Sequence, residues 1–433
     1  MRRAMLTLAV LGALATSAAA QPPVIVRHVL PNGLVVLVRE DPAVGVVAAS
    51  LLIRSGSAFE TADTAGVTNF LQRAMLRGTS RHSTLALAEA AEELGGALEA
   101  SGDVDYAEVR GTAIARHWEA LLALLAEVAL EPTLPAAEID KERALILGQL
   151  QTRADQPFPR ALDTALADLY GGHPYAWPAL GRAESVARLT REALRERYAA
   201  AYRADRMVLA VAGGVPRQRV IAAAERLFKR VPGATAASAG PAVEAAPRGE
   251  RRLVERDARQ AQVLVGFLAP PLTHPDYAAM RVLGAVLGGG MSSRLFVELR
   301  DRRGLAYSTG VLTTNRTGPS LFLPYLGTAP GNADAAVAGV LAEVDRLRRD
   351  PVEERELARA KAWLLGNLAM DRRTSARHAW YLAFFELVGG GWDWPERYAR
   401  AVEAVTIADL ARVAERYLAR PTVIVLRPAE ATR

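Results

Sequence analysis

AEV at Ala126–Val128 opens a stretch of sequence that ends with LGQL at Leu147–Leu150. The second half of the chain repeats this pair, as AEV at Ala342–Val344 and LGNL at Leu365–Leu368. In both copies a proline, an acidic helix start and a long amphipathic helix lie between the two motifs. Chance similarity between alanine-rich helices is the alternative explanation. A repeat of this kind predicts two structural units that are built alike.

A linker-like segment separates the two copies. From Val231 to Gly249 the chain consists mainly of Ala, Pro, Gly and Ser, with almost no large apolar residues, and such a composition is typical of a connection between folded units. We therefore predict an N-terminal unit over residues 21–231, a linker over 232–249 and a C-terminal unit over 250–433.

Apolar spacing in the N-terminal unit predicts both strands and helices. Alternating apolar residues flank the turn Pro31-Asn32-Gly33 and predict a β-hairpin. A third strand is expected at 46–54, and two more surround Gly102-Asp103. Helical spacing covers residues 65–76, 85–94, 117–130 and 136–153. The predicted fold class is α+β, with an antiparallel β-sheet covered by helices in each unit.

The composition is that of a folded globular protein. Of the 433 residues, 51% are hydrophobic and 23% are charged, and the formal net charge is +6. Nearly all basic residues are arginines, and many stand beside acidic residues, as in Arg191–Arg197. This pattern indicates solvated helix faces with local ion pairs. No basic block with interleaved aromatic residues is present, so we expect no nucleic-acid partner.

The N-terminus has the three parts of a secretory signal peptide. Arg2 and Arg3 precede an apolar run over residues 4–15, and small residues follow at Ser17–Ala20. A buried first helix is the alternative. We predict a signal peptide over residues 1–20 and an exported mature chain, periplasmic or secreted. No later stretch is long and apolar enough for a transmembrane helix, so stable membrane insertion is not expected.

The segment AGVTNFLQRAMLRGT at residues 65–79 resembles the zinc-binding segment of the pitrilysin and mitochondrial-processing-peptidase family, the inverted zincins. In that family one helix carries H-x-x-E-H. Asn69 and Arg73 stand at the two histidine positions here, and Gln72 stands at the glutamate position. The family's third zinc ligand, a glutamate on a later helix, corresponds to Gln149.

These four positions form a degenerate metal site. Neutral amides are poor zinc ligands and cannot act as general bases, and Arg73 would put a permanent cation where a divalent ion binds. The sequence contains no cysteine, and none of its six histidines pairs with another at a spacing that could rebuild the site. We predict no metal in this chain. The three residues of the first helix are either a polar face without a role, or they form hydrogen bonds in a relic pocket or bind a partner.

Residues 288–308, GGGMSSRLFVELRDRRGLAYS, match the family's most recognisable C-terminal signature, and this signature is intact. The resemblance implies that Arg300 and Tyr307 contact substrate near the zinc site of another domain. The plain alternative is an exposed arginine and a tyrosine packed at a strand start. His173-Pro174-Tyr175 resembles another family segment, and we interpret it as a structural turn.

A lost metal site combined with an intact arginine–tyrosine segment resembles the metal-free subunits of two-subunit family members. The resemblance implies a chain that forms half of a clamshell and supplies Arg300 and Tyr307 to a homologous partner. That partner would carry H-x-x-E-H and the zinc, and the pair would process or degrade peptides. This chain alone would hold no cofactor and be inactive. The alternative is a non-enzymatic scaffold, like the core subunits of the respiratory bc1 complex, or a peptide-binding protein of the same fold.

Overall fold

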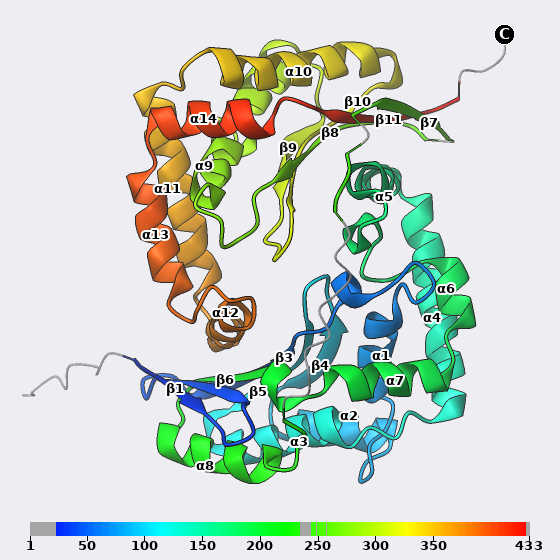
Figure 1. Cartoon of the computed structure of the whole chain (residues 1–433), viewed down its shortest axis with the longest axis vertical. Helices are drawn as coiled ribbons and strands as arrows, with labels where there is room; N and C mark the ends of the chain where they lie inside the picture. Colours follow the sequence, from blue (N-terminus) through cyan, green and yellow to red (C-terminus); the bar gives the residue numbers. More distant parts are fainter. Residues whose placement is uncertain (1–22, 234–243, 248, 257, 430–433) are drawn as a thin grey trace, which may run out of the picture.

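The structure, a computed structural model, describes residues 23–233, 244–247, 249–256 and 258–429 (Figure 1). The predicted signal peptide and most of the predicted linker lie outside the described residues. The remaining chain forms two sheets with helices around them, one from the first half and one from the second. The predicted α+β fold is therefore confirmed.

Six strands form the sheet of the first half, in the order β1-β2-β6-β3-β5-β4. β1 and β2 form the predicted antiparallel hairpin, in which Val29 lies opposite Val35. Gly33 in the turn has a φ of 95°, a conformation that L side chains rarely adopt. The strands are β1 (Val24–Val29), β2 (Val35–Glu40), β3 (Val46–Ile53), β4 (Ala97–Gly102), β5 (Ala107–Ile114) and β6 (Met207–Gly213).

The second sheet repeats this topology with one strand fewer. Its order β7-β11-β8-β10-β9 corresponds strand by strand to β2-β6-β3-β5-β4. β2 pairs with β6 in parallel, as β7 does with β11, while the other pairs are antiparallel. Both sheets are thus mixed, because β6 and β11, the last strands of their halves, run parallel to β2 and β7. The prediction of antiparallel sheets is therefore wrong for these two pairs. The strands are β7 (Arg251–Glu255), β8 (Ala261–Ala269), β9 (Ser308–Thr313), β10 (Ser320–Thr328) and β11 (Thr422–Arg427).

The helices cover the two faces of each sheet. Those of the first half are α1 (Val67–Met75), α2 (Thr84–Glu93), α3 (Trp118–Leu130), α4 (Ala136–Asp155), α5 (Pro157–Tyr170), α6 (Ala183–Arg188), α7 (Arg191–Ala201) and α8 (Arg217–Phe228). Those of the second half are α9 (Tyr277–Gly288), α10 (Ala333–Arg349), α11 (Glu354–Asp371), α12 (Ser375–Leu387), α13 (Trp394–Ala404) and α14 (Ile407–Tyr417). α1, α3 and α8 pack on the first sheet, and α9, α10 and α14 pack on the second.

The two halves exchange one helix each. α12 of the second half packs on β3 and β6, so that Phe384 shares a core with Leu52 and Ala210 of the first sheet. α5 of the first half packs on β8 and β11 in the same way. Leu169 approaches so closely that a β-carbon at Gly266 would lie 2.4 Å from its Cδ1 atom. The two exchanged helices lie between the facing sheets (Figure 1).

Candidate functional site

Helix α1, which carries the degenerate motif, is fixed at its N-terminus by a buried carboxylate. Glu60 accepts hydrogen bonds from the backbone N–H groups of Gly66 (2.7 Å) and Thr68 (2.9 Å), and burial raises the pKa of this carboxyl. Arg197 donates to the Thr68 hydroxyl (3.1 Å) and to the Gly56 carbonyl (3.1 Å). The prediction that this arginine belongs to a solvated face is therefore wrong, because it binds the start of α1 at Thr68 and the segment before that helix at Gly56.

A close approach of two glycines places α1 against the loop before α6. Gly66 and Gly181 have φ values of 94° and 96°, and a β-carbon at Gly181 would lie 2.6 Å from the Ala65 carbonyl oxygen. Real β-carbons do not tolerate such a distance to backbone atoms. The glycine at this position therefore permits the contact that holds the helix start.

We expect Gly181→Ala to lower the free energy of unfolding by about 2 kcal/mol, because it adds both a backbone clash and a strained φ. Gly148→Ala is the matched control, since Gly148 lies inside α4 with no atom within 4 Å of an added β-carbon. That change should raise stability by up to about 1 kcal/mol. Urea unfolding of both variants measures the difference, and equal midpoints would contradict the role given to Gly181.

Two of the positions that the sequence analysis assigned to a degenerate metal site, Arg73 and Gln149, belong to an ion-pair network with Arg77 and Glu142, here called the Arg73 network. Glu142 of α4 is fully buried. One of its oxygens accepts from Arg73, and the other accepts from the Nε atom of Arg77 at 2.8 Å. Arg73 also donates from Nη1 to the side-chain oxygen of Gln149 at 2.6 Å. The degenerate positions on α1 and α4 are thus in direct contact.

The other two residues of the motif behave differently. Gln72 is fully buried and donates to the Tyr202 hydroxyl at 2.7 Å, on the side of α1 that packs on α7. The side chain of Asn69 is partly buried, and its Nδ2 atom has no hydrogen-bond partner. Hydrogen bonding, one of the possibilities raised by the sequence, is therefore found for Gln72 and Arg73, whereas Asn69 Nδ2 has no partner among the described residues.

These residues do not fit a zinc ion. The guanidinium of Arg73 is bound to the Glu142 carboxylate and to Gln149, so a permanent cation and its counter-ion occupy the position. Amides supply the remaining polar groups on α1, and zinc prefers imidazole, thiolate and carboxylate ligands. In the part of the chain that the structure describes, no cluster of three or more His, Asp or Glu residues could hold a metal ion.

Sequence reasoning missed Glu142 and Arg77, although a signal for both was present. Glu142 lies seven residues before Gln149 on the same helix, so the two side chains share one face. Arg77 lies four residues after Arg73, which places it one turn further along the chain. An acidic residue facing two arginines at the end of a neighbouring helix and just beyond it indicates a buried ion pair.

Arg300 and Tyr307 lie in the second half, away from any polar partner. Arg300 belongs to a π-helix, η5 (Phe296–Arg302), and its guanidinium lies 4.8 Å from the centre of the Phe296 ring. Tyr307 directly precedes β9, and 62% of it is exposed. Among the described residues, neither side chain forms a hydrogen bond or an ion pair. In particular, neither forms one with a residue of the Arg73 network. Both groups are therefore available to a ligand or to another chain.

The segment His173-Pro174-Tyr175 forms a turn, as predicted, in which His173 Nδ1 accepts from the Tyr175 backbone N–H at 3.1 Å. The Tyr175 hydroxyl donates to Asp105 at 2.6 Å and accepts from the backbone N–H of Gly318 at 3.0 Å. Gly318 lies in the loop between β9 and β10 of the second half. The turn thus joins the two halves.

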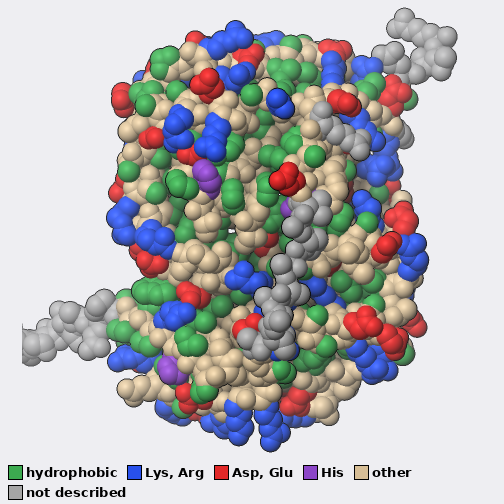
Figure 2. Space-filling view, in the orientation of Figure 1, with side chains coloured by type: hydrophobic (Ala, Val, Ile, Leu, Met, Phe, Trp, Pro, Cys, Tyr) green, Lys and Arg blue, Asp and Glu red, His purple; other side chains and the backbone are tan. Residues whose placement is uncertain are grey.

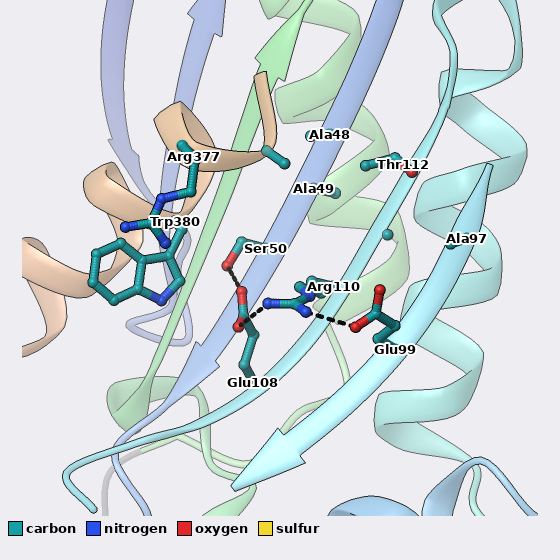
Figure 3. A pocket seen from close by; sticks show the side chains of 12 residues that line it. Ala48, Ala49, Ser50, Ala97, Glu99, Glu108, Arg110, Thr112, Arg377 and Trp380 are labelled. Atoms are coloured by element: carbon teal, nitrogen blue, oxygen red, sulfur yellow. Dashed lines mark hydrogen bonds and ion pairs between the residues drawn. The ribbon is translucent and has the colours of Figure 1, made fainter. Parts of the chain in front are cut away.

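A polar pocket of about 200 Å³ lies between the first sheet and α12 (Figure 3). Glu108 of β5 points into it and accepts a hydrogen bond from the Ser50 hydroxyl at 2.6 Å. Arg110 lies 3.6 Å from Glu108 and 2.6 Å from Glu99. Trp380 of α12 closes the opposite side. Burial is the largest influence on Glu108 and raises its pKa.

This raised pKa makes stability depend on pH. Ionised Glu108 is less favourable in the folded protein than in the unfolded chain, where a glutamate has a pKa of about 4.3. Its contribution is therefore fully present below that value and is lost as the pH rises through the folded pKa. Glu108→Gln should unfold at a higher urea concentration than the wild type at pH 8, with no difference below pH 4.

The control for this prediction is Glu99→Gln, since Glu99 has a side chain that is 57% exposed and shares the Arg110 partner. We expect it to shift the urea midpoint little at either pH. If Glu108→Gln were less stable than the wild type at pH 8, the ion pair with Arg110 would outweigh the cost of burial.

Basic and acidic side chains are interspersed over the face shown in Figure 2, which carries no continuous basic block. No helix in the described part of the chain has both the length and the hydropathy needed to cross a membrane.

Two family descriptions match successive parts of the chain. Residues 35–182 match "Insulinase (Peptidase family M16)", and residues 188–364 match "Peptidase M16 inactive domain". Among similar curated proteins, an uncharacterized zinc protease of Mycobacterium tuberculosis is 32% identical over 91% of each chain. An uncharacterized zinc protease of Bacillus subtilis is 27% identical over 80% of this chain and 84% of its own.

Solved structures share the fold. A protease from Helicobacter pylori superposes with a TM-score of 0.87 at 22% identity, covering 94% of this chain and 100% of its own. A peptidase M16 inactive domain from Pseudomonas fluorescens gives the same TM-score at 23% identity, covering 94% and 99%.

Proposed function

The chain belongs to peptidase family M16, and from this premise we propose that it is the metal-free subunit of a heterodimeric zinc metallopeptidase. Its partner is a homologous chain that carries H-x-x-E-H and the zinc ion. The pair processes or degrades peptides or small proteins. This chain supplies Arg300 and Tyr307, which hold the substrate at the partner's metal site.

One observation carries the proposal. The Arg73 network includes two of the positions that the resemblance assigns to zinc ligands, whereas Arg300 and Tyr307 have no polar partner among the described residues. A guanidinium binds a peptide carbonyl or carboxylate through charge-assisted hydrogen bonds, and a phenol can donate to a developing oxyanion. Within its described residues the chain thus offers groups suited to positioning a substrate, but no cluster of ligands for a metal that would activate water.

The proposal extends to location. The signal-like segment at residues 1–20 favours an exported chain that meets its partner and its peptide substrates outside the cytoplasm. N-terminal sequencing of the mature protein tests this part independently of the partner.

The proposal is tested by purifying the tagged chain gently from the exported fraction of its own host. Mass spectrometry of the eluate should identify a stoichiometric companion with H-x-x-E-H, and metal analysis should find about one zinc per pair. A chain recovered alone and without metal would favour the scaffold or peptide-binding alternative.

A further inference from the structure

The second half has its own counterpart of the degenerate metal position. Asn367 of α11 stands where the repeat places Gln149 of α4, and it lines a cavity of about 440 Å³ between α9, α11, α12 and α13. Aromatic side chains make up much of the cavity wall. They include Tyr277, Trp363, Trp380, Tyr381, Trp394 and Tyr398.

A guanidinium without a counter-ion lines this cavity. Arg281 of α9 donates from Nη1 to the side-chain oxygen of Asn315 at 3.2 Å. Its Nε atom is buried and has no hydrogen-bond partner. Across the described residues, no carboxylate lies within ion-pair distance of this side chain. A buried charge of this kind is costly unless something pairs with it.

The neighbouring polar groups cannot supply the missing negative charge. The phenols nearest to Arg281 belong to Tyr277 and Tyr398, and burial raises the pKa of both, so they stay neutral at pH 7. Asp371 also lines the cavity, but its carboxylate already accepts hydrogen bonds from Arg377 and from the Tyr381 hydroxyl. The positive charge of Arg281 therefore remains unmatched.

We propose that this cavity binds a carboxylate attached to an aromatic or other large apolar group. The carboxylate pairs with the Arg281 guanidinium, whose planar N–H groups match its geometry. The apolar body packs against the tryptophan and tyrosine rings, which favour aromatic partners. The volume is in the range of ordinary small-molecule sites and holds one large side chain with its carboxylate.

Two sources present this chemistry, the C-terminus of a peptide and a free aromatic acid. The site lies wholly in the second half and uses neither Arg300 nor the partner subunit. The proposal for this cavity can therefore be tested independently of the function proposed above.

The test is a calorimetric titration of the full chain with three probes. These are the tripeptide Ala-Ala-Phe, the same tripeptide with a C-terminal amide, and N-acetyl-phenylalanine. We expect the tripeptide acid to bind at least ten times more tightly than its amide. Comparable affinities of the tripeptide acid and N-acetyl-phenylalanine would assign the site to free acids, and a preference for the tripeptide would assign it to peptide C-termini.

Arg281→Met should weaken binding of the acids at least tenfold. Arg359→Met is the matched control, because Arg359 is an exposed arginine of α11 outside the cavity, and binding should stay at the wild-type level. Equal affinity for acid and amide, unchanged binding by Arg281→Met, or no binding of any acid at millimolar concentration would each overturn the proposal. If Arg281→Met does not fold, the proposal is tested by the wild-type chain alone, from its affinity for the tripeptide acid compared with that for the tripeptide amide.

Discussion

Arg300→Ala should lower kcat/KM of the reconstituted enzyme pair about a hundredfold, while the two subunits still assemble. In the role proposed for it, Arg300 is a charged donor that contacts the substrate where charge develops, and the loss of such a donor has an effect of this size. Arg300 is well suited to this test, because its guanidinium lies over the Phe296 ring and its removal breaks no ion pair in the described chain. Rates on a quenched-fluorescence peptide and size-exclusion profiles of the pair provide the two measurements.

Arg302→Ala is the matched control for this variant. Arg302 lies on the same π-helix, its side chain is 70% exposed, and its ion-pair partner in the described chain is Glu298, one turn away at 3.1 Å. Its removal should leave both the rate and the assembly close to the wild type. An unchanged rate for Arg300→Ala would favour the scaffold role, since a scaffold has no need of this side chain.

Glu142→Ala should lower the free energy of unfolding by about 3–5 kcal/mol. Glu142 is fully buried, and the side chains of its two partners are partly buried. Arg73 is 21% exposed and Arg77 is 34% exposed. Removing the carboxylate leaves two half-buried cations facing each other without a counter-ion, and breaking one side of a buried pair has a cost of this size. Urea unfolding at neutral pH measures the loss.

Two further variants separate this cause from general damage to α4. Glu138→Ala removes a carboxylate of the same helix whose partner Lys141 is 70% exposed, and the expected loss is below about 0.5 kcal/mol. Replacing Arg73, Arg77 and Glu142 together by methionine should retain most of the wild-type stability, because no buried charge remains unpaired. A triple variant as unstable as Glu142→Ala would show that packing, and not charge, dominates at this position.

Much of the fold could be predicted from the sequence because its signals are local. The Asn-Gly turn predicted the β1–β2 hairpin, and the repeat predicted two units that are built alike, each with its own sheet. The direction of strand pairs could not be predicted in this way, since an apolar pattern is the same for parallel and antiparallel neighbours. The parallel pairs β2–β6 and β7–β11 therefore appeared only in the structure.

The candidate site was predictable only in part, for a similar reason. Motif spacing brought Arg73 and Gln149 together correctly, but it did not indicate that Glu142 would bind Arg73 in place of a metal. Glu108 and Arg281 were not found at all. Their unusual environments arise from helices packed across long sequence distances, such as α12 over the first sheet.

The exchange of α5 and α12 makes the two halves dependent on each other during synthesis. The first sheet is complete once β6 has emerged from the ribosome, yet its inner face keeps apolar residues such as Leu52 uncovered until α12 has been made. Until then the nascent chain exposes an apolar sheet face to which other incompletely folded chains can bind. Binding of a chaperone, or delayed compaction of the first half, would keep this surface from aggregating. A chain truncated before α12 would leave the same surface exposed permanently and is expected to aggregate.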